Sequence, residues 1–441
     1  MTKLGQKLFI VTIILTIVTY SPQVALCAPQ SHQQMRDRTP VRLVVNFASP
    51  DGLRVSKVGL STDSVLQMPS DRLLRALDLS VLRSGQWANS VRATANGASF
   101  DYQLSDGWGY PGDAQNPYSR GRWPYEDFTA WEDYVQGTVT SAHGKHIVWD
   151  VWRWPNAPAQ WPGTRAQYCE LLSRTWKVLQ ANIGPSASVV LPHFSTYDSA
   201  HIEEMVEYAE HLDANVAQVD WCETCTGSAE HRGTSHAAEF RRWFKHTFPK
   251  RHVPEIVLDY SVLDTPTSAQ LLSELADAHS AQATALFDLY DKSGSSATKY
   301  FPFNSSHSGV VPLYWLLRSD AAGRNARVWC VSTSPQYLVS ASARGELAHS
   351  CQVMVARLPS SSTASAQSFQ IDLIGLDKLA PFRGHKKLLL TLQRVRSDMS
   401  NEQTSPRTIA SVPLALSNGR VRTAISGLQP GEVFLIIVRP M

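Results

Sequence analysis

The run His146-Ile147-Val148-Trp149-Asp150-Val151-Trp152 decides the fold of this 441-residue chain, and Arg153-Trp154-Pro155-Asn156 follows it directly. Apolar side chains occupy both odd and even positions of the run. A strand with one wet face alternates apolar and polar residues, whereas a strand buried in a parallel sheet is almost continuously apolar. We therefore predict a buried parallel strand over residues 146–152.

The sequence around this strand alternates short β-rich runs with segments of helical periodicity, from Lys57 to Asp320. A helix over residues 240–248 has a predicted cap at Thr234 or Ser235. Other helical faces are expected near residues 128–135, 168–179, 202–209 and 271–275. The remaining strands are predicted at residues 58–60, 79–83, 188–191, 216–221 and 255–259, with a last one at Tyr300–Phe303.

About eight strand–helix units over roughly 260 residues predict a (β/α)8 TIM barrel, an α/β fold, which we place at residues 57–322. A doubly wound open sheet is the alternative. It is disfavoured because no G-x-G-x-x-G or Walker pattern follows the first strand.

The pattern changes near Gly323, after which strand-like runs follow one another without helices. These runs are residues 327–331, 352–356, 369–374, 387–395 and 433–438. Polar turns separate them, which predicts a small C-terminal antiparallel β-sandwich over residues 323–441. The strand-like segment Val41–Phe47 precedes the barrel and is expected to join the sandwich.

The N-terminus has the pattern of a signal peptide over residues 1–27. Two lysines open the chain, the apolar run Leu8–Val18 is too short to span a membrane comfortably, and small residues flank a cleavage position near Cys27. The protein is therefore expected to be secreted or periplasmic, with no membrane association after cleavage. A retained anchor is the alternative, and a lipoprotein is disfavoured because Leu26 is large for that position.

Composition limits the possible partners. Hydrophobic residues make up 43% and charged residues 18% of the chain, which excludes a disordered class. The chain has 41 Lys and Arg against 38 Asp and Glu, so no broad basic face is expected and nucleic acid is a poor partner.

Five cysteines remain after the predicted cleavage, and export makes disulfides possible. We predict a cross-strand bridge between Cys330 and Cys351. Cys222 and Cys225 form either a disulfide or two free thiols, since no second close Cys/His pair completes a zinc site. An odd number leaves at least one thiol free.

Three strand ends together resemble a known enzyme family. The run Trp149–Asn156 resembles the W-E-x-W-N-E-P-N stretch of clan A glycoside hydrolases, especially family 39, the β-xylosidase and α-iduronidase family. The run Val219–Glu223, V-D-W-C-E, is similar to the family's sixth-strand V-S-W-H-E. The run Pro254–Tyr260, P-E-I-V-L-D-Y, is similar to its seventh-strand P-I-I-x-T-E. The resemblance covers most of the mature chain and implies the same barrel and trailing β-sandwich.

The resemblance implies a retaining mechanism, in which one carboxylic acid protonates the leaving oxygen and a second carboxylate attacks the anomeric carbon. This sequence departs from the family at both positions. Trp154 stands in place of the acid Glu, and Asp259 in place of the nucleophilic Glu. Arg153 replaces the Asn that contacts the sugar, and Cys222 replaces the sixth-strand His.

Three interpretations therefore stand. The preferred one is an active hydrolase of O-glycosidic bonds in a polysaccharide or oligosaccharide, with Asp259 as nucleophile or base and Glu223 as a relocated acid; Asp150 is a poorer candidate. The second is an inactive carbohydrate-binding protein, in which Arg153 pairs with an acidic sugar. The third is a structural surface protein. The predicted substrate-binding residues are Trp152, Arg153, Trp154, Asn156, Trp161 and Trp221.

Each of these residues also has a structural explanation. The tryptophans can be packing residues, and Arg153 can neutralise Asp259 or Glu223. The carboxylate of Asp259 can be structural, and Glu223 can lie in a solvated loop. Surface or helix-capping roles are expected, rather than metal binding, for His193, His201, His231 and His236. No cofactor or metal is implied.

Overall fold

The computed structural model describes residues 40–52, 57–62, 71–111, 120–142, 146–223, 232–261, 267–289, 310–359, 367–396 and 406–441. The predicted signal peptide, residues 1–27, lies outside these ranges. In the described ranges, no helix reaches the length and hydropathy that a membrane span requires.

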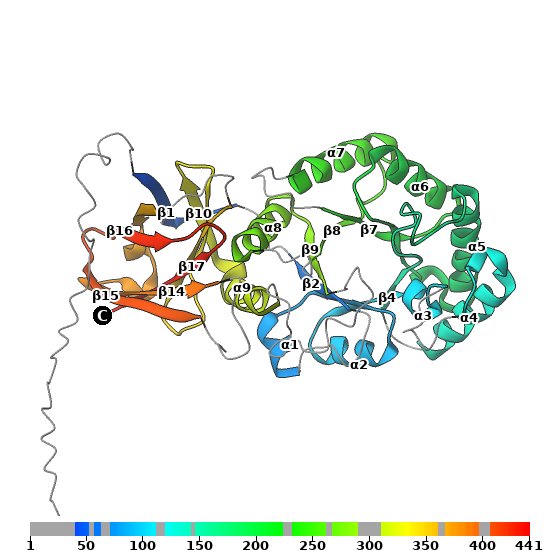
Figure 1. Cartoon of the computed structure of the whole chain (residues 1–441), viewed down its shortest axis with the longest axis horizontal. Helices are drawn as coiled ribbons and strands as arrows, with labels where there is room; N and C mark the ends of the chain where they lie inside the picture. The colour runs from blue at the N-terminus through cyan, green and yellow to red at the C-terminus, as the bar shows by residue number, and fades with distance from the viewer. Residues whose placement is uncertain are drawn as a thin grey trace, which may run out of the picture. The chain divides into compact units, whose positions relative to one another are not determined.

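Eight parallel strands close into a barrel, as predicted (Figure 1). The strands are β2 (Val58–Ser61), β3 (Val81–Ser84), β4 (Ser99–Gln103), β5 (Ile147–Asp150), β6 (Val189–Phe194), β7 (Val216–Cys222), β8 (Glu255–Ser261) and β9 (Thr284–Asp288). The apolar run 146–152 contains β5, which is the fourth strand of the barrel. Closure comes from β9 pairing in parallel with β2.

Two barrel strands differ from the predictions. The third, β4, was not predicted. The eighth is β9, whereas the predicted last strand, Tyr300–Phe303, lies outside the described residues.

Helices surround the barrel strands (Figure 1). They are α1 (Asp71–Leu77), α2 (Trp87–Ala95), α3 (Leu104–Trp108), α4 (Phe128–Ser141), α5 (Arg165–Ile183), α6 (Ser199–His211), α7 (Arg232–Thr247), α8 (Ser268–Ser280) and α9 (Val310–Gly323). Side-chain caps define several of the helix starts. Thr164 and Thr267 form capping boxes with Gln167 and Gln270 at the starts of α5 and α8.

The predicted cap of α7 was wrong. The helix already begins at Arg232, so Thr234 lies inside its first turn. The hydroxyl of Thr234 donates to the Asp277 carboxylate of α8 at 2.8 Å, and its backbone N–H donates to the same carboxylate at 3.1 Å. The carboxylate of a neighbouring helix therefore satisfies the start of α7, which is a contact that local sequence does not reveal.

The barrel interior changes from apolar to charged toward the carboxyl ends of its strands. Val81, Val257 and Leu286 form a small apolar cluster of their own. Because side chains alternate along a strand, the residues two positions further point to the same interior. Those residues are Arg83, Asp259 and Asp288, all of them buried.

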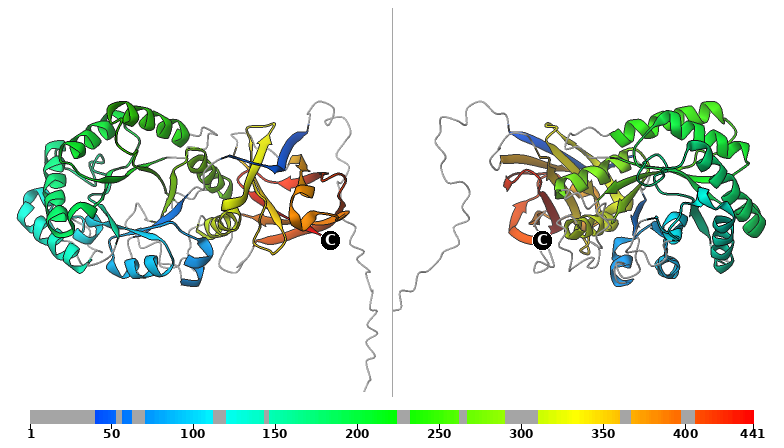
Figure 2. Two further views of the ribbon diagram at one scale, coloured as in Figure 1. Left: turned by 180° about the vertical axis from the view of Figure 1, so that it is seen from behind. Right: turned by 45° about the vertical axis from the view of Figure 1, so that its right-hand side comes forward.

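A second sheet has nine strands in the order β15-β14-β17-β12-β11-β10-β1-β13-β16. The strands are β1 (Val41–Pro50), β10 (Arg327–Ser332), β11 (Tyr337–Ser342), β12 (Cys351–Arg357), β13 (Gln367–Ile374), β14 (Lys387–Val395), β15 (Arg407–Ala415), β16 (Val421–Leu428) and β17 (Val433–Pro440). Neighbours are antiparallel except β1 and β13. The expectation that the N-terminal strand joins this sheet is confirmed (Figure 2). The sheet encloses its own apolar core.

The predicted Cys330–Cys351 disulfide was wrong. Both thiols are free, as are those of Cys169 and Cys222. Strand β11 lies between β10 and β12, so the two cysteines are separated by two strand spacings, about 10 Å. A disulfide requires Cα atoms within about 7 Å.

Candidate active site

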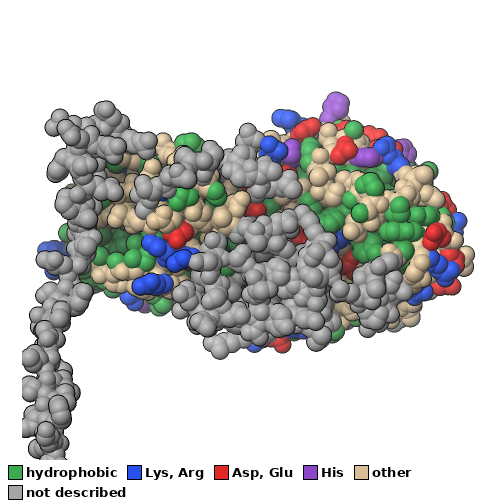
Figure 3. Space-filling model, viewed as in Figure 1, with side chains coloured by type: hydrophobic (Ala, Val, Ile, Leu, Met, Phe, Trp, Pro, Cys, Tyr) green, Lys and Arg blue, Asp and Glu red, His purple; other side chains and the backbone are tan. Residues whose placement is uncertain are grey.

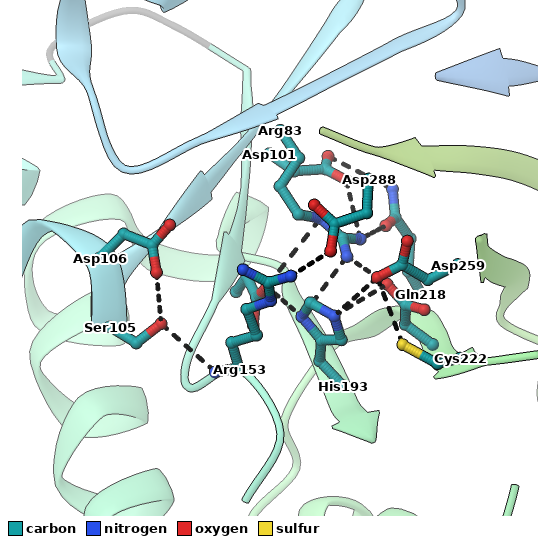
Figure 4. A network of polar contacts seen from close by, with 12 residues as sticks. Arg83, Asp101, Ser105, Asp106, Arg153, His193, Gln218, Cys222, Asp259 and Asp288 are labelled. Carbon is teal, nitrogen blue, oxygen red and sulfur yellow. Dashed lines mark hydrogen bonds and ion pairs between the residues drawn. The ribbon is translucent and has the colours of Figure 1, made fainter. Parts of the chain in front are cut away.

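A cluster of charged side chains fills the barrel at the carboxyl ends of its strands, where barrel enzymes carry their chemistry (Figure 4). Successive strands contribute one buried group each: Arg83 from β3, Asp101 from β4, Asp150 from β5, His193 from β6, Asp220 from β7, Asp259 from β8 and Asp288 from β9. Each is at most 2% exposed. The sequence singled out only Asp150, Asp259 and His193 of these.

Arg83 contacts carboxyl groups from three other strands on one side of the cluster. Its guanidinium pairs with Asp220 and lies 3.3 Å from the Asp101 carboxylate. A third carboxylate, that of Asp150, is 3.9 Å from its Nε atom. The guanidinium also donates to the Gln218 side-chain oxygen at 3.3 Å. A single cation therefore balances three buried carboxylates.

The cluster contains more carboxyl groups than cations, and the pKa values of some of these carboxyl groups are raised. Burial raises the pKa of Asp101 to about 7, although Arg83 opposes the change. Burial also raises the pKa of Asp220, against the charges of Arg83 and His193. Groups that would be ionised on the surface therefore hold protons more tightly here.

His193 bridges the two halves of the cluster. Its Nδ1 atom lies 2.7 Å from Asp150 Oδ2, and its Nε2 atom lies 3.4 Å from Asp259 Oδ2. Burial by itself lowers the pKa of His193, but the carboxylates of Asp220 and Asp150 outweigh it and raise the pKa to about 9. The ring is therefore an imidazolium that donates from both nitrogens. The expected surface or helix-capping role of His193 was wrong.

The protein is expected to lose stability as the pH rises from about 6.5 to about 9. The folded-state pKa of His193 lies above its ordinary value of 6.5, so the contribution of this group is complete below pH 6.5 and is lost through pH 9. Urea midpoints at pH 6, 7.5 and 9 should show the advantage of wild type over His193→Gln shrinking across this range. The partly exposed His201, paired with Asp198 at 3.1 Å, supplies the control variant His201→Gln. Parallel pH profiles for wild type and His193→Gln would contradict the assignment.

Asp259 is an ionised carboxylate at the centre of the cluster. Burial raises its pKa, but the hydrogen bond and charge of His193 and the charge of Arg153 outweigh burial and lower it. The thiol of Cys222 also donates to Asp259 Oδ2, over 3.6 Å. Among the described residues, the other oxygen, Oδ1, has no hydrogen-bond partner. A buried carboxylate with one uncommitted oxygen is suited to act as a nucleophile or base.

Asp288 lies at the end of the next strand and pairs with Arg153, and Figure 4 shows the two side chains pointing toward each other. Arg153 was expected to neutralise Asp259 or Glu223; it pairs directly with Asp288, and its charge also helps to lower the pKa of Asp259. Burial raises the pKa of Asp288 well above its ordinary range, and the charge of Asp259 adds to this, while Arg153 opposes it. Asp288 was not among the predicted site residues, because the last strand was expected further along the chain.

Glu223 has its hydrogen-bonding partners on the helix side of β7. Its Oε1 atom accepts from the Trp221 indole N–H at 2.8 Å and lies 2.7 Å from His236 Nδ1 on α7. Strand alternation puts Cys222 on the face that meets Asp259, and Trp221 and Glu223 on the opposite face. The backbone N–H of Glu223 donates to the Asp259 carbonyl at 2.9 Å. The structure therefore brings the two backbones together but directs the Glu223 carboxylate toward α7.

Most of the predicted sugar-binding tryptophans lie in the core. Trp152 and Trp221 are 0% exposed and Trp161 is 3% exposed. The indole N–H of Trp152 donates to the Gln160 carbonyl at 3.0 Å. These positions show a packing role, and their contact with substrate stays a prediction.

Trp154 and Asn156 lie in the loop after β5. Trp154 has a φ of 55°, in the left-handed region that bulky residues rarely adopt. The guanidinium carbon of Arg153 lies 4.0 Å from the centre of its ring, so the cation stacks on the indole. Asn156 accepts the backbone N–H of Ser195 at 2.8 Å, which joins the loops after β5 and β6.

His193, Asp220 and Asp259 have the donor types of a metal site, with ligand atoms within 4.8 Å of one another. The Arg83 guanidinium already pairs with Asp220. We therefore interpret the trio as part of an ion network.

The missed residues share a signal that sequence could have supplied. Arg83, Asp101, Asp220 and Asp288 each lie within or at the end of a short β-rich run. Side chains two positions apart on a strand point to the same face. The residue two positions after an apolar interior residue therefore points into the site. Applying that alternation to the predicted strands would have selected Arg83 and Asp220, whereas Asp101 and Asp288 lie on strands that were not predicted.

Comparisons with solved structures give the same fold. Chains that match over almost their full length include a glucosidase from Croceicoccus marinus (TM-score 0.65, 13% identity, 92% of this chain and 100% of that chain). A monomeric β-xylosidase from Caulobacter crescentus matches similarly (TM-score 0.65, 13% identity, 91% and 99%), as does a family 39 glycoside hydrolase from Xanthomonas axonopodis pv. citri (TM-score 0.64, 10% identity, 93% and 99%). No protein-family model and no curated sequence matches the chain. The resemblance seen in the strand-end motifs is confirmed at the level of the fold.

Proposed function

We propose that this chain, which has the fold of family 39 and related clan A glycosidases, hydrolyses O-glycosidic bonds in a polysaccharide or oligosaccharide. The observation that carries the proposal is a pair of buried carboxyl groups, on adjacent strands, whose pKa values are moved apart. The pKa of Asp259 is lowered and that of Asp288 is raised. Such a pair divides the roles of base and acid between two residues of the same chemical type. Export by removal of residues 1–27 is part of the proposal and is supported by the sequence pattern there.

In the proposed reaction, protonated Asp288 gives its proton to the glycosidic oxygen as the bond from that oxygen to the anomeric carbon breaks. Asp259 either attacks the anomeric carbon or takes a proton from a water that attacks it. Water supplies the hydroxyl group of the released sugar in both cases. The stereochemistry of the product distinguishes the two, since attack by Asp259 followed by water retains the anomeric configuration and direct attack by water inverts it.

The sequence assigned the acid role to Glu223, and the structure favours Asp288. Glu223 accepts a hydrogen bond from the Trp221 N–H and lies 2.7 Å from His236 Nδ1 on α7, so its carboxylate is directed away from Asp259. Asp288 is buried near Asp259, and the charge of Asp259 favours its protonated form. An acid must hold its proton at the working pH, so Asp288 meets the chemical requirement better.

Purified wild type is expected to cleave at least one substrate in a panel of neutral and acidic glycans, with products detected by mass spectrometry. On that substrate, Asp288→Asn should lower kcat by about 10²–10⁴-fold, the usual loss for a general acid. Glu223→Gln is the matched control and should retain most of the activity. The reverse order of the two variants would return the acid role to Glu223. Hydrolysis that neither variant impairs would contradict both assignments.

Carbohydrate binding without hydrolysis is the second candidate function, and one observation favours it. Trp154 and the stacked Arg153 occupy the loop after β5 where the resemblance places the acid, and Arg153 also pairs with Asp288. This ion pair favours the carboxylate form of Asp288 and opposes the effect of burial, which raises the pKa of Asp288. Saturable quenching of tryptophan fluorescence by a glycan that is not cleaved, weakened by Trp154→Ala, would decide for this candidate.

A further inference from the structure

The outer face of the second sheet carries an arginine cluster on one side of β1. Asp372 of β13 has a side chain that is only 1% exposed, because three guanidiniums cover it. Arg42 donates to its carboxylate at 2.7 Å, the Nε of Arg420 donates at 2.7 Å, and Arg422 donates at 3.0 Å. The three cations lower the pKa of Asp372 far below its ordinary range. Three positive charges against one negative charge leave this point of the face with a net charge of +2.

Most of the donors in the cluster are directed away from Asp372. Each guanidinium has five N–H donors in a planar fork, and Asp372 accepts only one or two from each arginine. The side chains of Arg42, Arg420 and Arg422 are 44%, 47% and 46% exposed. An anion arriving from solvent would accept the remaining donors and reduce the repulsion among the three cations. The cluster is therefore complementary to carboxylate or sulfate groups.

An exposed indole lies on the same face, on the other side of β1. Trp329 and Val331 of β10 are 44% and 42% exposed. Val331 is paired with Val44 of β1, which is paired in turn with Asp372, so these residues form one row across the face. Trp329 is two residues further along β10. Two strand spacings and two residues place its backbone about 12 Å from that of Asp372.

We propose that this face, made by Arg42, Trp329, Val331, Asp372, Arg420 and Arg422, binds an acidic polysaccharide. The indole of Trp329 packs against the apolar face of a sugar ring, and the arginines bind carboxylate or sulfate groups further along the same chain. The choice of a polysaccharide rests on the proposed function, since the face would hold a polymer that the barrel cleaves. The exposed indole and the arginine cluster themselves are argued from geometry alone.

Other anionic polymers fit the face less well. Nucleic-acid binding usually uses a broad basic surface, and this protein has a formal net charge of only +3. In the view of Figure 3, the described surface of the molecule carries both basic and acidic side chains. A linear acidic polysaccharide needs one stacking position and one cluster of cations, which is what the sheet offers.

The test is affinity electrophoresis of the full chain carrying Asp259→Asn, which prevents hydrolysis of the probe. Native gels contain polygalacturonate, dextran sulfate or neutral dextran. Both acidic polymers should retard the protein and dextran should not, with retardation falling as salt is added. Trp329→Ala and the double variant Arg420→Gln/Arg422→Gln should each weaken binding about tenfold, equivalent to about 1.4 kcal/mol. The exposed residues Arg251 and Ile409 supply the controls Arg251→Gln and Ile409→Ser, which should bind normally.

Retardation by one acidic polymer only would identify carboxylate or sulfate as the group recognised and would support the proposal. Absence of retardation by both, or normal binding by Trp329→Ala, would overturn it. Single-stranded DNA binding that is tighter than polysaccharide binding and is lost in the same variants would reassign the face to nucleic acid. Trp329→Ala in an otherwise wild-type chain should hydrolyse small glycosides normally. If the proposed hydrolysis fails, the binding result can therefore still be interpreted.

Discussion

Replacing Arg83 by methionine is expected to lower the free energy of unfolding by about 3–5 kcal/mol, the usual cost of removing one partner from a buried ion network. The guanidinium is fully buried and faces Asp101, Asp150 and Asp220. Methionine fills much of the same volume but leaves three carboxyl groups without their cation. These groups must then be buried as uncompensated charges or take up protons at neutral pH.

Urea denaturation of wild type and Arg83→Met at pH 7 measures the loss. Arg165→Met is the matched control, because Arg165 forms an exposed pair with Glu204 and such pairs contribute less than about 1 kcal/mol. The loss for Arg83→Met should shrink as the pH falls, because burial raises the pKa values of Asp101 and Asp220 and these two groups take up protons first. A loss no larger than that of the control would mean that the cluster does not depend on its central cation.

Replacing Asp259 by asparagine is expected to reduce kcat/KM at least about 10³-fold on any glycan that the wild type cleaves. Asparagine has the shape of aspartate but can neither attack an anomeric carbon nor remove a proton from water. It also removes a negative charge beside His193, 3.4 Å away, so the pKa of that ring should fall. Loss of turnover together with a lower His193 pKa would show that both roles belong to the same carboxylate.

Kinetics on the most rapidly cleaved glycan and an NMR titration of the His193 ring provide the two measurements. Asp213→Asn is the control, since the side chain of Asp213 is 83% exposed on the protein surface. The variants should have matching circular dichroism spectra. If Asp259→Asn keeps activity within tenfold of wild type, Asp259 is not the nucleophile or base, and the proposed reaction fails with it.

The fold was predictable where strands are apolar, and less so where they carry the site. Strand β5 is a nearly continuous apolar run, and it was recognised. Strand β4 has the sequence S-F-D-Y-Q, with Asp101 and Gln103 buried, and it was missed. Phe100 and Tyr102 are buried as well, but Asp101 between them is polar because it belongs to the ion cluster, so the correlation between burial and hydrophobicity fails at that position. Edge strand β15 was missed for another reason, since most of its residues are exposed.

The individual positions of the site were more predictable than their partners. The resemblance placed Asp259 at the end of the seventh barrel strand, and the structure agrees. The pairing of Arg83 with Asp220 joins residues 137 positions apart, and that of Arg153 with Asp288 joins residues 135 apart. Such pairings exist only because the barrel closes and brings its strand ends together. The local sequence therefore does not indicate these pairings.

The position of β1 in the second sheet has a consequence for how the chain is made. It lies between β10 and β13, although about 280 residues separate it from β10 in sequence. At ordinary elongation rates, on the order of tens of seconds pass between the synthesis of β1 and the appearance of its first partner. During that interval both of its hydrogen-bonding edges are open to other chains. A ribosome-bound chain that stops before residue 327 therefore exposes an aggregation-prone segment near its start. Protection of that segment by a chaperone would be most valuable during this interval.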